Sequence, residues 1–176
     1  MKKEIVYSEN KVVQADRIMS ESTADRRWWV VVVLLIMCLY WLSNVVLWIP
    51  WSHNPQLGMV LMLTVNPVFW GIGIYRCLAC KGGAENLMKK AFIVSLIAVG
   101  ISLISDYLFF AVLMKSKDVW HITTFYGYAW LVVLAFSEAS LLKKRLSSLS
   151  FVPTAKTLLV LVSCLLLLLS FILYLI

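Results

Sequence analysis

The chain has 176 residues, of which 62% are hydrophobic and only 14% carry a charge. Soluble domains average about 25% charged residues, so this composition excludes a soluble globular protein and predicts a membrane protein. The formal net charge is +7, but the basic residues flank long apolar runs, which is typical of membrane topology and not of nucleic-acid binding. We therefore expect membrane lipid as the surrounding partner and no nucleic acid.

The chain begins with a polar cytoplasmic tail, residues 1–27, which precedes a single transmembrane domain at residues 28–176. Ile5, Val12 and Met19 recur near one face of a helix, so the tail is either a helix on the membrane surface or a disordered segment. The sequence leaves both alternatives open.

Five apolar runs are long enough to cross a membrane as helices, because a bilayer core takes about 20 residues in helical form. The expected spans are residues 28–49, 57–75, 91–114, 121–142 and 157–176. Pro50 should end the first span, and Pro67 should kink the second, because a proline removes one helical hydrogen bond. The predicted fold is therefore all-α, a polytopic bundle of five transmembrane helices, with the last helix at its periphery.

Positive charge gives the expected orientation. Fourteen of the 16 Lys and Arg residues fall in the tail and in the second and fourth links, which share one side in a five-span protein. Lys115 and Lys117 lie in the third link, on the other side. The amino terminus is thus predicted to be cytoplasmic and the carboxyl terminus outside, in a multi-pass protein of the cell inner membrane.

The third run is unusual because it carries Asp106 among apolar residues. Lipid cannot solvate a carboxylate at this depth, so Asp106 must face protein or water. At helical spacing one face of the run is small and polar, and the opposite face is apolar. The polar face comprises Ser95, Ala98, Ser102, Ser105 and Asp106, and the apolar face comprises Ile93, Ile97, Ile101, Ile104 and Leu108. We expect the polar face to turn into the bundle.

Depth places polar residues of the other spans near the level of Asp106. At a rise of about 1.5 Å per residue, Asn44, Asp106 and Tyr126 lie about 22 to 24 Å from the cytoplasmic ends of their spans. The resulting layer comprises Ser43, Asn44, Asn66, Ser102, Ser105, Asp106, Thr123 and Tyr126. The residues that we predict to bind a substrate or an ion are Asn44, Asn66, Ser102, Asp106 and Tyr126.

Two functions fit this layer. In the first, Asp106 binds a cation, a proton or the polar end of a substrate, and the protein, alone or as a homo-oligomer, translocates a small solute, ion or lipid. In the second, Asp106 exchanges hydrogen bonds with Asn66 and Tyr126 to fix helix packing, and the chain is a non-catalytic accessory or assembly subunit of a partner membrane protein. Glu138 is expected to be solvated at the interface or paired with Arg76.

The sequence argues against an intramembrane enzyme, because no pair of catalytic residues falls at one depth. Asp106 and Glu138 are expected about 16 Å apart along the membrane normal. Cys77 and Cys80 have the spacing of a redox or zinc motif, but a reducing cytoplasm and the lack of a second ligand pair favour unmodified thiols, with lipidation as an alternative. No catalytic residue, metal ligand or cofactor is predicted.

Overall fold

A computed structural model describes residues 2–83, 86–113, 115, 122–149 and 151–175, with side chains from Ser22 onward except at residues 48, 113, 122, 123 and 175. The helices are α1 (Lys2–His53), α2 (Pro55–Ala79), α3 (Leu87–Asp106), the π-helix η1 (Tyr107–Leu113), α4 (Ile122–Leu141), α5 (Lys143–Ser148) and α6 (Ala155–Leu175). The helical stretches in the described residues that are long and apolar enough to cross a membrane number four: Ser22–His53, Pro55–Ala79, Leu87–Val112 and Ala155–Tyr174. These features are those of an all-helical, multi-pass membrane protein.

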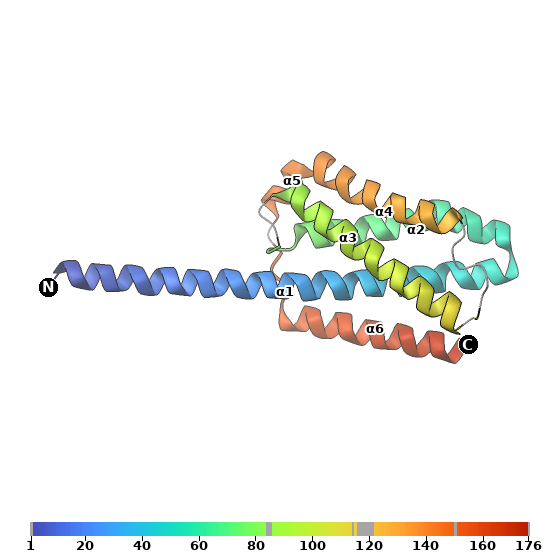
Figure 1. Cartoon of the computed structure of the whole chain (residues 1–176), viewed down its shortest axis with the longest axis horizontal. Helices are drawn as coiled ribbons and strands as arrows, with labels where there is room; N and C mark the ends of the chain where they lie inside the picture. The colour runs from blue at the N-terminus through green and yellow to red at the C-terminus, as the bar shows by residue number, and fades with distance from the viewer. Residues whose placement is uncertain (1, 84–85, 114, 116–121, 150, 176) are drawn as a thin grey trace.

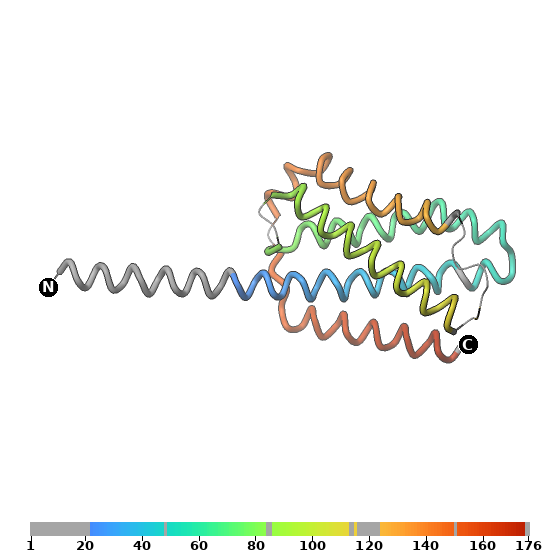
Figure 2. The backbone as a smooth tube through the Cα atoms, viewed as in Figure 1, coloured from blue at the N-terminus to red at the C-terminus, as the bar shows by residue number. Residues whose placement is uncertain are grey.

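The long helices run up and down along one axis of the molecule (Figure 1). α2 and α4 run in the direction opposite to α1, α3 and α6. The backbone trace shows α6 alongside α1, on the side away from α4 (Figure 2), and α6 contacts α1. Most α6 side chains are exposed, Leu159 and Leu167 among them, so α6 is peripheral, as its nearly uniform Leu, Val and Ile composition predicts.

The first helix ends at His53, which corrects the prediction that Pro50 would end it. Pro50 lies in the last turns of α1, and its carbonyl accepts a hydrogen bond from the Asn54 amide at 2.8 Å. A proline removes a single backbone hydrogen bond, and here the helix continues for three residues past it, to His53. Asn54 then caps α2 by accepting from the Gln56 amide at 3.0 Å, with Pro55 in the first turn.

α2 is longer than the predicted span 57–75, and its helical backbone is unbroken across Pro67. Its last turn stays helical because Cys77 and Ala79 are buried in the bundle. A glycine allows α1 and α2 to approach closely, since a Cβ on Gly73 would lie 1.9 Å from Leu39 Cδ1. Small residues at helix contacts are typical of membrane proteins, where packing replaces the hydrophobic effect.

A glycine turn separates α2 from α3. Gly82 and Gly83 have φ angles of +107° and +86°, a region that other residues rarely adopt. A Cβ on Gly82 would lie 2.8 Å from the Ala24 carbonyl oxygen, so the turn also packs closely on α1. The Gly83 amide donates to Asp25 Oδ1 at 3.0 Å. This hydrogen bond holds the turn against the part of α1 that enters the bundle.

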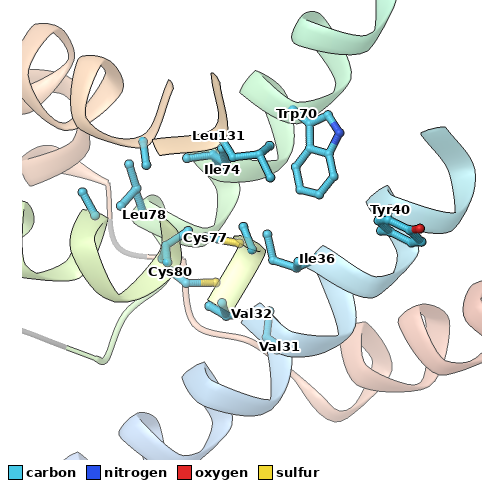
Figure 3. Close-up of a cluster of buried hydrophobic side chains, with 14 of the residues drawn as sticks. Val31, Val32, Ile36, Tyr40, Trp70, Ile74, Cys77, Leu78, Cys80 and Leu131 are labelled. Carbon is cyan, nitrogen blue, oxygen red and sulfur yellow. The ribbon is translucent and has the colours of Figure 1, made fainter. Parts of the chain in front are cut away.

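The core lies where α1, α2 and α4 meet. Val32 and Ile36 of α1 face Ile74 and Cys77 of α2, and Leu131 of α4 covers them (Figure 3). All five side chains are buried. This core holds α1, α2 and α4 together between Asp106 and the turn that joins α2 to α3.

The predicted polar face of α3 is buried in the bundle. Its residues are between 0% and 8% exposed: Ser95, Ala98, Ser102, Ser105 and Asp106. The predicted apolar face is less uniform, because Ile104 and Leu108 are exposed whereas Ile93, Ile97 and Ile101 pack partly against the core. α3 contacts α1, α2 and α4, so only a narrower strip of it is free for lipid.

Residues 2–27 of the predicted tail fall within α1, and residue 1 lies outside the described residues. Its side chains before Ser22 lie outside the described ones. From Ser22 to Arg27 the residues are exposed or partly exposed, and burial begins at Trp28. Burial in the bundle thus begins at the residue where the first span is predicted to start, and the stretch of α1 that is long and apolar enough to cross a membrane is Ser22–His53.

Candidate functional site

Two tyrosines hold the Asp106 carboxylate in the middle of the bundle. The Tyr40 hydroxyl donates to Asp106 Oδ1 at 2.5 Å, and the Tyr128 hydroxyl donates to Asp106 Oδ2 at 2.5 Å. Tyr40 belongs to α1, Asp106 ends α3 and Tyr128 belongs to α4. This tyrosine–aspartate–tyrosine clamp therefore links three helices through one buried carboxyl group, whose residue is 8% exposed.

The clamp differs from the predicted partners of Asp106, which were Asn66 and Tyr126. Tyr126 is 70% exposed, because two residues along a helix turn a side chain by about 200° and Tyr128 takes the inward direction. Sequence reasoning missed Tyr40 since aromatic residues are common in apolar spans. A signal was present, however: Tyr40 lies four residues before Asn44 and therefore on the same helical face.

A cavity of about 670 Å³ opens beside the clamp, between α1, α2, α3 and α4. Its lining comprises Tyr40, Ser43, Asn44, Leu47, Met59, Met62, Leu63, Asn66, Pro67, Trp70, Ser102, Asp106, Thr124, Tyr126, Gly127, Tyr128, Trp130 and Leu131. Such a volume falls in the range of small-molecule sites, which are mostly apolar with a few convergent polar groups. The cavity matches this description, since aliphatic and aromatic side chains surround one carboxylate.

The predicted binding residues all line this cavity: Asn44, Asn66, Ser102, Asp106 and Tyr126. Their role in binding stays a prediction. Asn44 donates through Nδ2 to the Tyr40 carbonyl at 3.0 Å. Ser43 also lines the cavity, Ser105 is buried outside its lining, and the side chain of Thr123 lies outside the described ones.

Three residues that line the cavity each carry a buried polar atom without a hydrogen-bond partner among the described residues: Ser43 Oγ, Asn66 Oδ1 and Ser102 Oγ. They belong to α1, α2 and α3, so three helices each contribute one such residue to the cavity wall. A buried polar atom without a partner costs about 1 to 3 kcal/mol. A guest in the cavity, water or solute, would offset this cost if the side chains turned toward it.

Aromatic contacts support Tyr40, one of the residues that line the cavity. The Tyr40 and Trp41 rings meet edge to face with centroids 5.2 Å apart, and Trp41 meets Phe109 in the same way at 5.9 Å. Phe109 belongs to η1, the π-helical segment that directly follows Asp106. π-Helical turns are frequent at functional sites. The clamp is thus held in place from both α1 and η1.

Glu138 does not occupy the solvated position expected for it. It is partly buried in α4, and its Oε2 atom is buried without a partner among the described residues. Its Oε1 atom lies against α2, 3.3 Å from the position of a Cβ on Gly71. The structure shows no hydrogen bond between Glu138 Oε2 and Arg76, although α2 and α4 are in contact.

Cys77 and Cys80 are both free and both buried. Burial raises the pKa of the Cys80 thiol, which lies just beyond the end of α2, and the nearby Lys90 and Arg76 act in the opposite direction. The Cys77 carbonyl accepts a hydrogen bond from the Trp28 indole at 3.1 Å. Within the described residues no group of three His, Cys, Asp or Glu is arranged to hold a metal ion. The pair thus packs the α1–α2 contact.

Comparison of the chain with protein-family models, with curated proteins and with solved structures gave no match.

Proposed function

We propose that the chain is a five-span protein of the cell inner membrane that binds a small solute, ion or lipid in the Asp106 cavity and translocates it. The observation that carries this proposal is the cavity of about 670 Å³ that Asp106 lines, together with Ser43, Asn66 and Ser102, each of which has a buried polar atom without a partner among the described residues. Buried polar groups in folded proteins are nearly always satisfied. A guest in the cavity would supply partners to these side chains once they turn toward it.

The lining of the cavity narrows the chemistry of the guest. One carboxylate and the Asn66 carbonyl oxygen are acceptors, so they favour a cation or a group that donates hydrogen bonds. Trp70, Trp130 and the clamp tyrosines also line the cavity, and aromatic faces attract cations. The remaining lining is mostly aliphatic. A small molecule with an apolar body and a cationic or hydroxyl-bearing end fits this combination best.

The five-span arrangement rests on α4. This helix has 20 residues, which correspond to about 30 Å of rise, the thickness of a bilayer core. It packs along α3 and α2 and runs antiparallel to α3. With α4 as a span, the basic tail and the basic second and fourth links share one side, which favours a cytoplasmic amino terminus and an external carboxyl terminus.

A second function is favoured by the clamp itself. Each oxygen of Asp106 already accepts one hydrogen bond, from Tyr40 or from Tyr128. A carboxylate satisfied in this way needs no bound guest to lock α1, α3 and α4 together. In that case the chain is a non-catalytic accessory subunit, and its exposed helix faces contact a partner membrane protein.

A cavity-filling substitution tests the proposal. Ser102→Leu puts an isobutyl group into the cavity from α3, so we expect the purified protein to lose bound small molecules that the wild type retains. Native mass spectrometry of the protein released from detergent micelles measures this retention. The expected result is a ligand adduct on the wild type that is absent from Ser102→Leu.

The matched control is Leu103→Phe, which also enlarges a side chain of α3. Leu103 is 41% exposed and does not line the cavity, so this variant should keep the adduct. If Ser102→Leu and Leu103→Phe retain the same adduct as the wild type, the molecule is bound elsewhere. The accessory-subunit function would then be the better account.

A further inference from the structure

A second cavity lies at the opposite end of the bundle from the Asp106 cavity, where α2 ends, α3 begins and α5 crosses between α4 and α6. Its volume is about 700 Å³. Its lining comprises Leu78, Ala79, Cys80, Lys81, Gly82, Asn86, Leu87, Met88, Lys90, Ala139, Lys143, Leu146, Ser147 and Leu149. Three lysines and no Asp or Glu are found among these described residues, so the cavity is basic.

The lysines come from three separate segments of the chain. Lys81 follows α2, Lys90 lies in the first turns of α3, and Lys143 begins α5. A backbone bridge ties the Lys81 segment to the chain beyond α5, because the Lys81 amide donates to the Phe151 carbonyl at 2.7 Å and the Phe151 amide donates to the Ala79 carbonyl at 3.3 Å. Convergence of three like charges on one cavity costs free energy unless an anion neutralises them.

Lys90 is the most constrained of the three. It is only 6% exposed, its ammonium group donates to the Cys80 carbonyl, and it lies 5.4 Å from the centroid of the Trp28 ring. An ammonium group has three hydrogens to donate, and one carbonyl with one aromatic face leaves donor capacity unused. Asp25, on α1 nearby, acts on Lys90 through its negative charge, while its Oδ1 atom accepts from the Gly83 amide. A buried charge of this kind calls for a further acceptor.

The start of α3 adds to the positive character of the same cavity. Asn86, Leu87 and Met88 line it, and these are the N-cap and first turn of a 20-residue helix. The Asn86 side chain accepts from the Met88 amide at 2.9 Å, which leaves other amides of the first turn available. The amino-terminal end of a helix carries a partial positive charge and binds phosphate groups.

We propose that this cavity binds a phosphate-bearing anion, with Lys81, Lys90 and Lys143 as its cationic ligands. The rest of the lining is aliphatic, including Leu78, Leu87, Leu146 and Leu149, which suits the acyl chains of an anionic phospholipid below its headgroup. Basic pockets between transmembrane helices commonly bind lipid headgroups in this way. This site is separate from the Asp106 cavity and does not depend on the function proposed for that cavity.

Lipid retention by matched charge variants tests the proposal. The protein is exchanged into detergent with equal amounts of phosphatidylglycerol and phosphatidylcholine, and native mass spectrometry counts the retained lipids. The wild type should retain phosphatidylglycerol in preference. The double variant Lys81→Gln, Lys143→Gln should retain roughly 25-fold less of it, about fivefold for each lysine removed. Both side chains are exposed at the cavity rim, so this variant is expected to fold.

The control variant is Lys144→Gln, Lys156→Gln, which removes the same net charge from the same end of the bundle. Neither residue lines the cavity, so this variant should retain phosphatidylglycerol within about twofold of the wild type, as is usual for exposed charges. A second arm adds millimolar inorganic phosphate. If phosphate binds the wild type but not the Lys81, Lys143 variant, and the wild type shows no preference among lipids, the ligand is a soluble phosphate-bearing molecule. Equal losses in both double variants, or no selectivity for either probe, would overturn the proposal.

Discussion

Replacing Asp106 with asparagine is expected to abolish translocation while the protein stays folded and inserted. Asparagine has nearly the same size as aspartate and can still accept a hydrogen bond from Tyr40 and form another with Tyr128, so the contact between α1, α3 and α4 survives. Interhelical hydrogen bonds in membranes are worth only about 0.6 kcal/mol on average, so stability should change little. What the substitution removes is the negative charge that pairs with a proton or cation.

The measurement is uptake by liposomes that contain equal amounts of the wild-type or variant protein, with a fluorescent organic cation of apolar body as the probe solute and entrapped dyes that report protons and metal cations. Glu138→Gln is the matched control, because it neutralises the other partly buried carboxylate, which lies outside the lining of the Asp106 cavity. This control should keep wild-type uptake. It should be at least as stable as the wild type, since Glu138 Oε2 is buried without a partner among the described residues. A fully active Asp106→Asn protein would contradict the transport function.

Cysteine labelling is expected to place the two ends of α6 on opposite sides of the membrane, with the α5 end inside. If α4 spans the membrane, Ser148→Cys faces the cytoplasm and Tyr174→Cys faces the outside. If α4 lies on the outer surface instead, α6 must cross in the other direction and both results reverse. The test is therefore all or none, and it separates a five-span from a four-span protein.

Both positions are exposed, so a cysteine there should react with a membrane-impermeant maleimide in a variant that lacks the four native cysteines. Ser22→Cys serves as the reference, because it marks the cytoplasmic side in both arrangements. We predict that Ser148→Cys is labelled under the same conditions as Ser22→Cys. Tyr174→Cys should be labelled by reagent added from outside. Labelling of Ser148→Cys from outside would rule out the five-span arrangement.

The inward face of α3 was predictable from the sequence because its side chains repeat with helical period. Ser95, Ala98, Ser102 and Asp106 fall on one face by spacing alone, and all are buried. The depth argument was also informative, since Asn44 and Asn66 line the same cavity as Asp106. Residue spacing determines which side chains share a face and a height.

The partners of Asp106 were not predictable in the same way. Spacing does not determine how far a neighbouring helix is rotated, and a rotation by half a turn exchanges Tyr126 for Tyr128. The choice of Tyr128 depends on packing between α3 and α4, which the sequence of α4 alone does not contain. The position of Glu138 also depends on packing between helices. Gly71 has no side chain, so it leaves room for the Glu138 carboxylate against α2.

The ends of the helices were less predictable than their existence. Pro50 is a helix breaker by propensity, but it lies where only one hydrogen bond is lost. The continuation of α2 to Ala79 depends on burial of Cys77 against α1, a tertiary contact. Local signals such as Asn54 and Asn86, which cap α2 and α3, identify the starts of helices more reliably than prolines identify their ends.

Access of an aqueous reagent to Ser102 tests the central claim most directly. Ser102→Cys and Ser95→Cys, each in the protein without native cysteines, place a thiol on the same buried face of α3. Only Ser102 lines the Asp106 cavity, whereas the Ser95 hydroxyl donates to the Phe92 carbonyl at 2.8 Å within its own helix. A small cationic methanethiosulfonate, added from outside, should modify Ser102→Cys and leave Ser95→Cys unmodified. If both thiols stay unmodified, the cavity is closed to solutes and Asp106 only fixes the packing of the helices.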